Sequence, residues 1–329
     1  YGGRTCLLAA LQQNQLSVAR WAVSSGSEIN LQSWPWYPPL NWAVAHDDID
    51  LLALMLRHGG DPEFCYVSDR EYAVHLAIKN GNLNAVKEFL AVGLNPNFTF
   101  SFKYPYMKCI SKNSLIAYAS SYNQFDIIEL LLNAGAYLNN SLNNSESLVA
   151  AVRSGPDDLV KELLNRGANP VSTGKIGSLD QEIPYFGSSR QSWSVAIAAA
   201  QNRVAVMDLL VDHGASLTNF YDDSTLNTDD FTDSPITPLA AAIAANSNQA
   251  LEFLIARLPH LDMNRLYPFP NYPCVPVLCG DNDFDRVRLL HLAARVGNQF
   301  AIKTLVAAGA NINSRGCWGD TACSSTVEL

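Results

Sequence analysis

Pairs of apolar residues recur along the chain, always three and four positions before a residue that marks the end of a segment. Ala22 and Val23 form the first such pair. Further apolar residues can stand one helical turn before the pair, as Ile127 and Ile128 do in the fourth unit. This spacing is typical of one face of a helix. The marking residue is glycine in seven places and leucine in one: Gly26, Gly59, Gly93, Gly135, Gly167, Gly214, Leu258 and Gly309. Glycine tolerates the left-handed backbone that often ends a helix, so the pattern predicts eight short amphipathic helices.

A second helix is predicted before each of these. Twelve residues ahead of every marking residue stands a Gly, Asn or Asp, and four residues earlier an alanine, in eight copies with the same internal spacing. The first of these turn residues are Asn14, Asp47, Gly81 and Asn123, followed by Gly155, Asn202, Asn246 and Gly297. All three residue types tolerate a left-handed backbone. Each copy is therefore a helix–turn–helix unit, which is too small to bury its own apolar face and must stack on its neighbours.

The unit resembles the ankyrin repeat. The runs TPL at 237–239, HLA at 75–77 and 291–293, and GANIN at 309–313 match the family pattern. The resemblance implies an all-α ankyrin-repeat solenoid forming a single domain over residues 1–329, and we expect it to be a fragment of a larger protein. Repeats are anchored near 5–26, 38–59, 72–93, 114–135, 146–167, 193–214, 237–258 and 288–309, with a partial finger at 314–329.

Extra residues lie between the units. The helix block never varies in length, so the additions fall in the fingers, which are the segments joining the second helix of one repeat to the first helix of the next. Long fingers are expected at about 94–113, 168–192, 215–236 and 259–287, as β-hairpins or loops. The alternation of aromatic residues from Phe98 to Tyr104 has period two, which predicts a short strand there.

Composition narrows the function. The chain has 22 basic and 31 acidic residues, a net charge of −9, and no basic run. Nucleic acid is therefore not expected as a partner. No apolar stretch reaches the ~18 residues that a membrane-spanning helix needs. Seven cysteines, without zinc spacing, favour reduced thiols in the cytoplasm or nucleus.

Aromatic residues are concentrated in the fingers, where loops are ordinarily small and polar. They either pack the fingers onto the helices or form a recognition surface. The candidate binding residues are the finger aromatics together with two residues of the first helices. They are Trp34, Trp36, Tyr37, His46, Phe98, Phe100, Tyr104, Tyr106, Tyr122, Tyr185, Phe186, Phe220, Tyr221, Tyr267 and Phe269.

The remaining polar positions add no catalytic chemistry. No nucleophile or phosphate-binding motif is present, and no metal or cofactor is implied. His75 and His291 occupy the structural histidine position of the family. His58 and His213 stand at helix ends, where a cation is favoured, and His46 is the least explained.

The resemblance favours a binding protein over an enzyme. The expected partner is a protein or peptide, held in a concave groove made by the first helices and the fingers. Other exposed first-helix positions would contribute: Lys79, Arg153, Gln201 and Arg295. The alternative is a small-molecule binder or enzyme whose long fingers roof an apolar pocket, lined by Trp34, Trp36, Phe98, Tyr185 and Tyr221.

Overall fold

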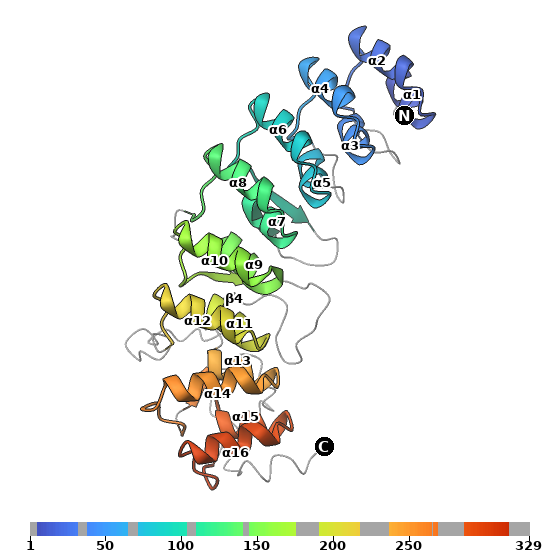
Figure 1. Ribbon diagram of the computed structural model, residues 1–329. Coiled ribbons are helices and arrows are strands. Elements are labelled where there is room, and N and C mark those ends of the chain that lie inside the picture. Colours follow the sequence, from blue (N-terminus) through green and yellow to red (C-terminus); the bar gives the residue numbers. More distant parts are fainter. Residues whose placement is uncertain are drawn as a thin grey trace. The chain divides into compact units, whose positions relative to one another are not determined.

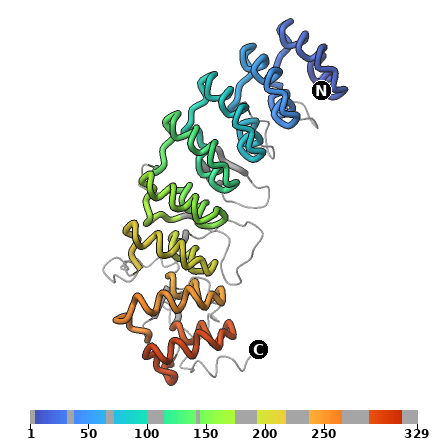
Figure 2. The backbone as a smooth tube through the Cα atoms, in the orientation of Figure 1, coloured from blue at the N-terminus to red at the C-terminus, as the bar shows by residue number. Residues whose placement is uncertain are grey.

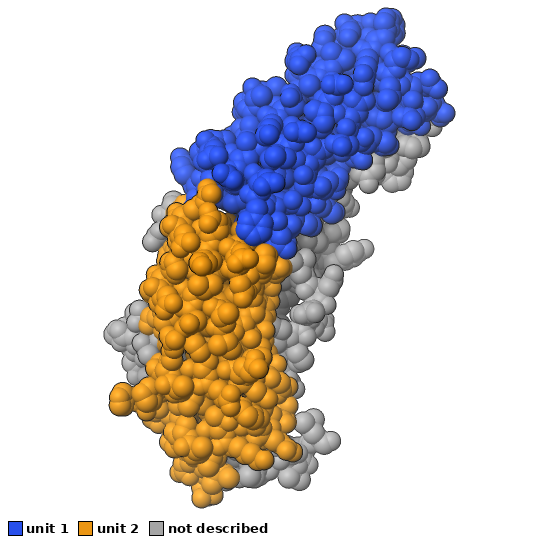
Figure 3. All heavy atoms as spheres, in the orientation of Figure 1, with its two compact units in different colours: residues 1–138 blue, residues 139–329 orange. Residues whose placement is uncertain are grey.

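The computed structural model describes residues 5–31, 38–64, 72–103, 110–140, 145–175, 191–217, 237–264, 266–268 and 286–315. The chain divides into two compact units, residues 1–138 and residues 139–329, coloured blue and orange in Figure 3. Each unit is a stack of helix pairs that follow one another in chain order (Figures 1 and 2).

Unit 1 contains four helix pairs and one hairpin among its described residues. The pairs are α1 (Cys6–Gln12) with α2 (Leu16–Ser24), α3 (Pro39–Ala45) with α4 (Ile49–Arg57), α5 (Ala73–Lys79) with α6 (Leu83–Ala91), and α7 (Leu115–Ser121) with α8 (Phe125–Asn133). The hairpin is β1 (Thr99–Lys103) with β2 (Ile110–Ser114), antiparallel, with Thr99 opposite Ser114. It confirms the strand predicted from the alternation after Phe98.

Unit 2 also contains four helix pairs among its described residues. They are α9 (Glu146–Ser154) with α10 (Asp157–Asn165), α11 (Ser194–Ala200) with α12 (Val204–Asp212), α13 (Pro238–Ala244) with α14 (Asn248–Arg257), and α15 (Leu289–Arg295) with α16 (Gln299–Ala307). Two antiparallel hairpins, β3 (Thr173–Lys175) with β4 (Gln191–Trp193) and β5 (Leu266–Pro268) with β6 (Arg286–Arg288), lie in predicted fingers. The eight predicted helix pairs are confirmed.

Polar side chains fix where several helices begin. Thr237 accepts the backbone N–H of Ala240 at the start of α13, at 3.3 Å. Asp48 does the same for Leu51 at the start of α4, at 2.9 Å. Such caps satisfy one of the N–H groups that have no partner inside the helix, and each is worth roughly 1 kcal/mol. Other capping residues are Thr5, Asn82, Ser114, Ser145 and Asn298.

The predicted turn residues adopt a left-handed backbone in seven repeats, as at Asn14 and Asp47, where φ is 54°. The prediction is wrong at Gly155, where φ is −86° and ψ is 162°. Pro156 follows it, and a residue before proline is restricted to extended backbone. The seventh marking residue, Leu258, also has a negative φ of −121°, and α14 continues to the residue before it.

Small residues bring neighbouring repeats together. In unit 1, Ala43, Ala77 and Ala119 are fully buried, and α3, α5 and α7 contact one another in sequence. Asparagine side chains add polar bridges between consecutive turns. Asn97 donates to the carbonyl of Gly135 at 3.0 Å and accepts the N–H of Tyr137 at 2.7 Å. Three asparagines repeat this pair of bonds elsewhere in the two units: Asn30, Asn139 and Asn264.

Candidate interaction surface

The structure describes the side chains of three predicted binding residues, namely His46, Phe98 and Tyr122. For Phe100 and Tyr267 it describes the backbone, in β1 and β5. The other predicted binding residues lie outside the described residues: Trp34, Trp36, Tyr37, Tyr104, Tyr106, Tyr185, Phe186, Phe220, Tyr221 and Phe269. The surface developed below therefore rests on unit 1, where all three described side chains are found.

Phe98 and Tyr122 are joined by a row of aromatic rings. Phe98 stands edge-on to Tyr72 at 5.4 Å between ring centroids, and Tyr72 stands edge-on to His75 at 5.1 Å. His75 stands edge-on to Tyr118 at 5.0 Å, whereas the rings of Tyr118 and Tyr122 are tilted by 57° at 5.0 Å. Edge-to-face contacts of this length are the preferred aromatic geometry, worth roughly 0.5–1.5 kcal/mol each beyond burial. The row holds the ring of Tyr118 in contact with those of His75 and Tyr122.

His75 is the buried centre of this row. Its side chain is fully buried, and burial lowers its pKa from 6.5 to about 3 because the charged imidazolium would lose its hydration. The ring is therefore neutral at physiological pH. It packs between Tyr72 and Tyr118, in keeping with the structural role expected for it.

Sequence reasoning missed Tyr72 and Tyr118. Tyr118 directly precedes the fully buried Ala119, and Tyr72 stands where the family pattern has threonine before proline. The available signal was positional. Tyr118 and Tyr122 are four residues apart, so they share a helix face.

A second ring pair lies on α3. Trp42 and His46 are also four residues apart, and their rings stack with centroids 3.8 Å apart and planes inclined by 15°. His46 caps the helix, and its Nδ1 lies 2.9 Å from the carbonyl oxygen of Trp42. His46 therefore has a local partner, which sequence reasoning had left open. Counted from the turn residues Asp47 and Asn123, this pair occupies the same positions as Tyr118 and Tyr122.

These residues, with those of the repeat between them, form one surface of unit 1. The rings of Trp42 and Tyr118 and the side chain of Leu76 are half-buried, and the four other side chains are exposed. We call this surface the first-helix face: Trp42, His46, Leu76, Lys79, Asn80, Tyr118 and Tyr122. Tyr122 is 39% exposed, so a large ring reaches solvent at its end. At the position that Trp42, Leu76 and Tyr118 occupy, unit 2 has smaller or aliphatic residues, none more than 8% exposed: Ala150, Ile197, Ala241 and Leu292.

Charge is unevenly distributed within unit 1. The four first helices, α1, α3, α5 and α7, contain no Asp or Glu, and their one formal charge is that of Lys79. The described acidic residues of unit 1 lie on or next to the second helices, at Asp47, Asp48, Asp50, Glu88, Asp126 and Glu129, or in the segments that follow those helices, at Glu28, Asp61 and Glu63. Asp48 is paired with Arg20 at 2.8 Å. The first-helix face is thus apolar and weakly basic in a chain of net charge −9.

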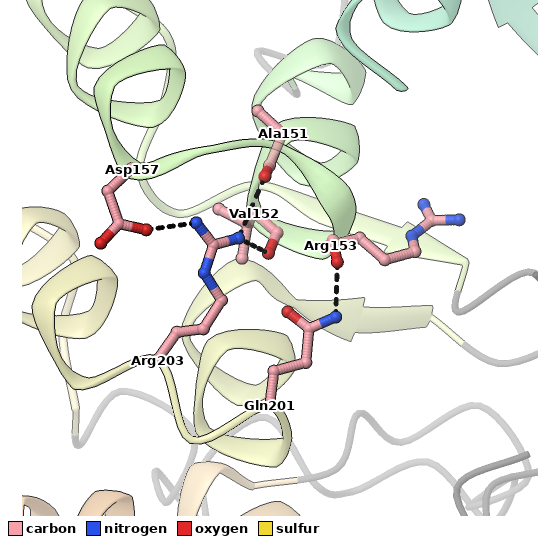
Figure 4. Close-up of polar contacts among 6 residues, drawn as sticks. All are labelled: Ala151, Val152, Arg153, Asp157, Gln201 and Arg203. Carbon is pink, nitrogen blue, oxygen red and sulfur yellow. Dashed lines mark hydrogen bonds and ion pairs between the residues drawn. The ribbon is translucent and has the colours of Figure 1, made fainter. Parts of the chain in front are cut away.

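Arg153 and Gln201, which were predicted to contribute from unit 2, lie where two successive repeats are hydrogen-bonded to each other (Figure 4). Gln201 donates to the carbonyl of Arg153 at 2.5 Å. Arg203 donates to the carbonyls of Ala151 and Val152, and it pairs with Asp157 at 2.5 Å.

The side chain of Arg153 points away from Gln201 and Arg203 (Figure 4). Partial burial lowers the pKa of its guanidinium, because the charged form loses hydration. The first-helix ends of these two repeats are thus held by hydrogen bonds between repeats.

Other site types find no support among the described residues. Within those ranges, no group of His, Cys, Asp or Glu is arranged to hold a metal ion. The described helices are all too short or too polar to cross a membrane.

Stacked helix pairs with hairpin-bearing fingers define a helical repeat protein. A family model of three ankyrin repeats matches residues 40–141, and a model of a single ankyrin repeat matches residues 289–317. Both units therefore contain ankyrin repeats, and ankyrin repeat domains are generally protein-interaction modules.

Solved ankyrin domains share this fold. The human ASB11 ankyrin repeat domain is 19% identical, over 77% of this chain and 98% of that domain, with a TM-score of 0.53. The ankyrin repeat domain of Bcl-3, a member of the IκB protein family, is 19% identical, over 77% of this chain and 99% of that domain, with a TM-score of 0.52. At this identity the likeness concerns the fold alone. Comparison with curated protein sequences gave no match.

Proposed function

We propose that the chain is a protein-interaction module that holds a segment of an intracellular partner protein on the first-helix face of unit 1. The observation that carries this proposal is the ring row that ends at Tyr122. Rigid aromatic rings with polar tips contribute large contact area at low entropic cost. Tyr118 and Tyr122 are held by ring contacts before any partner arrives, which lowers the cost of ordering them on binding.

The presence of ankyrin repeats does not favour the alternative, a pocket roofed by the fingers. Four of its five lining residues, Trp34, Trp36, Tyr185 and Tyr221, lie outside the described residues. The fifth, Phe98, packs against Tyr72 in the ring row. The first-helix face is therefore the surface on which the proposal rests.

The test compares the protein with two matched variants as bait. In the first variant, His46→Ala and Tyr122→Ala remove two exposed rings of the face. In the second, Trp21→Ala removes a ring that is 64% exposed on α2, outside the face. Retained proteins are quantified by mass spectrometry, and circular dichroism checks that both variants are folded.

The proposal predicts a partner that is retained by the wild type and the Trp21 variant and lost from the double variant. Removing exposed hot-spot rings typically costs about 2 kcal/mol or more, roughly a thirtyfold loss of affinity. A partner retained equally by all three proteins would show that the first-helix face is not the binding surface. Retention of a small molecule in place of any protein would support the pocket.

A further inference from the structure

Arg153 differs from other arginines of unit 2 in having no counter-ion. Its side chain, on the last turn of α9, is half-buried, and its Nε is shielded from solvent without a hydrogen-bond acceptor among the described residues. Its terminal nitrogens likewise make no hydrogen bond or ion pair with the described part of the chain. A guanidinium keeps its charge in proteins. Three other arginines of unit 2 each pair with a carboxylate: Arg166, Arg203 and Arg257.

The acidic residues nearest to Arg153 in the sequence are engaged elsewhere or lie at a distance. Asp157 pairs with Arg203 at 2.5 Å, and the guanidinium of Arg153 points away from that pair (Figure 4). Glu146 begins α9, about 10 Å along the helix from Arg153. The next first helices, α11, α13 and α15, contain no Asp or Glu. The described first helices of unit 2 therefore offer no carboxylate beside Arg153.

The surroundings of Arg153 strengthen its attraction for an anion. Ala150 lies one turn earlier on α9, and Ala200 holds the equivalent position on α11, which contacts α9; each is 8% exposed. Gln201 donates to the carbonyl of Arg153 at 2.5 Å, so the ends of the two helices are fixed against each other. Alanine side chains offer neither a counter-ion nor an acceptor. Attraction between opposite charges grows where burial lowers the local dielectric.

A single guanidinium in this position favours an anion of single charge. Its planar fork of donors matches the two oxygens of a carboxylate, which accept two parallel hydrogen bonds. A phosphate dianion would leave a second negative charge uncompensated, in a chain whose net charge is already −9. The site therefore fits a carboxylate better than a phosphate.

We propose that Arg153 is the binding site for a carboxylate of a bound protein segment, either an Asp or Glu side chain or the C-terminus of the segment. The carboxylate accepts hydrogen bonds from the terminal nitrogens of Arg153, beside the ends of α9 and α11. The inference goes beyond the proposed function, because it assigns a contact to unit 2 and does not depend on the first-helix face of unit 1.

Protection of Arg153 from chemical modification tests the site on the full chain. Phenylglyoxal modifies arginines, and peptide mapping by mass spectrometry follows the rate at each one. The probes, at 0.1 M and constant ionic strength, are sodium acetate, sodium phosphate, and blocked pentapeptides Gly-Ser-Glu-Ser-Gly and Gly-Ser-Gln-Ser-Gly. Sodium chloride is the reference. The internal controls are two exposed arginines, Arg57 and Arg315.

A lone charge-assisted pair corresponds to a dissociation constant on the order of 0.1 M. Acetate and the Glu peptide are therefore expected to slow the modification of Arg153 about twofold, by mass action. Arg57 and Arg315 are expected to change by less than about 1.2-fold, because water screens an exposed charge. Phosphate is expected to protect Arg153 less than acetate does, and the Gln peptide not at all.

A second measurement does not require Arg153 to react with the reagent. Urea unfolding is compared in 0.5 M sodium acetate and 0.5 M sodium chloride, for the wild type and for Arg153→Gln. The same dissociation constant predicts that acetate raises the ratio of folded to unfolded wild type about sixfold more than that of the variant. The variant corrects for the general effect of acetate on stability.

Four results would overturn the inference. Two of them are protection of Arg153 no greater than that of Arg57 and Arg315, and an equal effect of acetate on the wild type and Arg153→Gln. Stronger protection by phosphate would assign the site to a different anion. Protection by acetate but not by the Glu peptide would restrict it to free ions. None of these results bears on the capture experiment with His46 and Tyr122, by which the proposed function is judged separately.

Discussion

Arg203 takes over a hydrogen bond that the backbone makes in the other repeats. In those repeats, the residue two positions after the C-cap of the first helix donates its backbone N–H to the carbonyl of the buried alanine, as Ser247 does to Ala242 at 2.8 Å. The turn residue donates its backbone N–H to the carbonyl of the residue after that alanine, as Asn246 does to Ile243. In the fifth repeat the first of these donors would be Pro156, which has no N–H. The N–H of Gly155, the turn residue, bonds the carbonyl of Ala151 at 2.7 Å in place of the missing donor. The carbonyl of Val152 is therefore left without a backbone donor, and it accepts from Arg203 instead.

Replacing Arg203 by methionine keeps most of the aliphatic stem and removes the donors. The carbonyl of Val152, a fully buried residue, is then left without the guanidinium, which costs about 1–3 kcal/mol. The ion pair with Asp157 adds at most about 1 kcal/mol, because the Asp157 side chain is 51% exposed. We therefore expect Arg203→Met to lower the free energy of unfolding by about 2–3 kcal/mol.

Urea unfolding followed by circular dichroism measures this loss, with Arg166→Met in the fifth repeat as the control. Arg166 pairs with Glu162 on one exposed helix face, so its loss should cost only about 0.3–0.5 kcal/mol. Each slope with urea is compared with that of the wild type, because stacked repeats do not always unfold in one step.

A double-mutant cycle with Pro156→Ala separates this explanation from general damage. Alanine restores a backbone N–H, so Arg203→Met should cost about 1–2 kcal/mol less in that background. An equal cost in both backgrounds would refute the compensation. So would an Arg203→Met cost no larger than that of Arg166→Met.

Two further perturbations test other parts of the structure. Because burial lowers the pKa of His75 from its ordinary value of 6.5 to about 3, the unfolded state binds the proton more readily than the folded state does. The free energy of unfolding should therefore fall as the pH drops below about 6.5, by up to roughly 1.4 kcal/mol per pH unit. Urea unfolding at pH 7, 6 and 5 should show a shallower fall in His75→Phe than in the wild type. Equal slopes would mean that His75 does not govern the acid sensitivity. Asn97→Ala should lower the free energy of unfolding by about 1–3 kcal/mol, because it removes two hydrogen bonds between repeats. Replacing Asn84, which is exposed on α6, by alanine should lower it by less than about 0.5 kcal/mol. Similar costs in urea unfolding would show that the asparagine bridge contributes little.

Sequence reasoning went furthest where the signal was local. The eight helix pairs followed from residue spacing, and most of the turns followed from the preference of Gly, Asn and Asp for a left-handed backbone. It failed at Gly155, where the neighbouring Pro156 overrode the preference of glycine. The proline was visible in the sequence. The partner that replaces its missing N–H, Arg203, comes from the next repeat and could not be read from local spacing.

The candidate surface was only partly predictable. His46, Phe98 and Tyr122 were singled out from the sequence as binding residues and His75 as a structural one, but Tyr72 and Tyr118, which complete the row between Phe98 and Tyr122, were not. Tyr72, His75 and Tyr118 come from two repeats, and they meet because α5 packs against α7. A contact between repeats depends on how the units stack, which no single period of the sequence encodes.

The sequence by itself determined the repeating unit and most of the places where its helices end. Each of these depends on spacing within one unit, which local backbone preferences and helix periodicity fix. Only the tertiary structure decided that the rings of Trp42 and His46 stack and that His75 is buried between two tyrosines. It also decided that α5 packs against both α3 and α7, which carry the two ring pairs, and this packing brings together side chains that are far apart in the sequence.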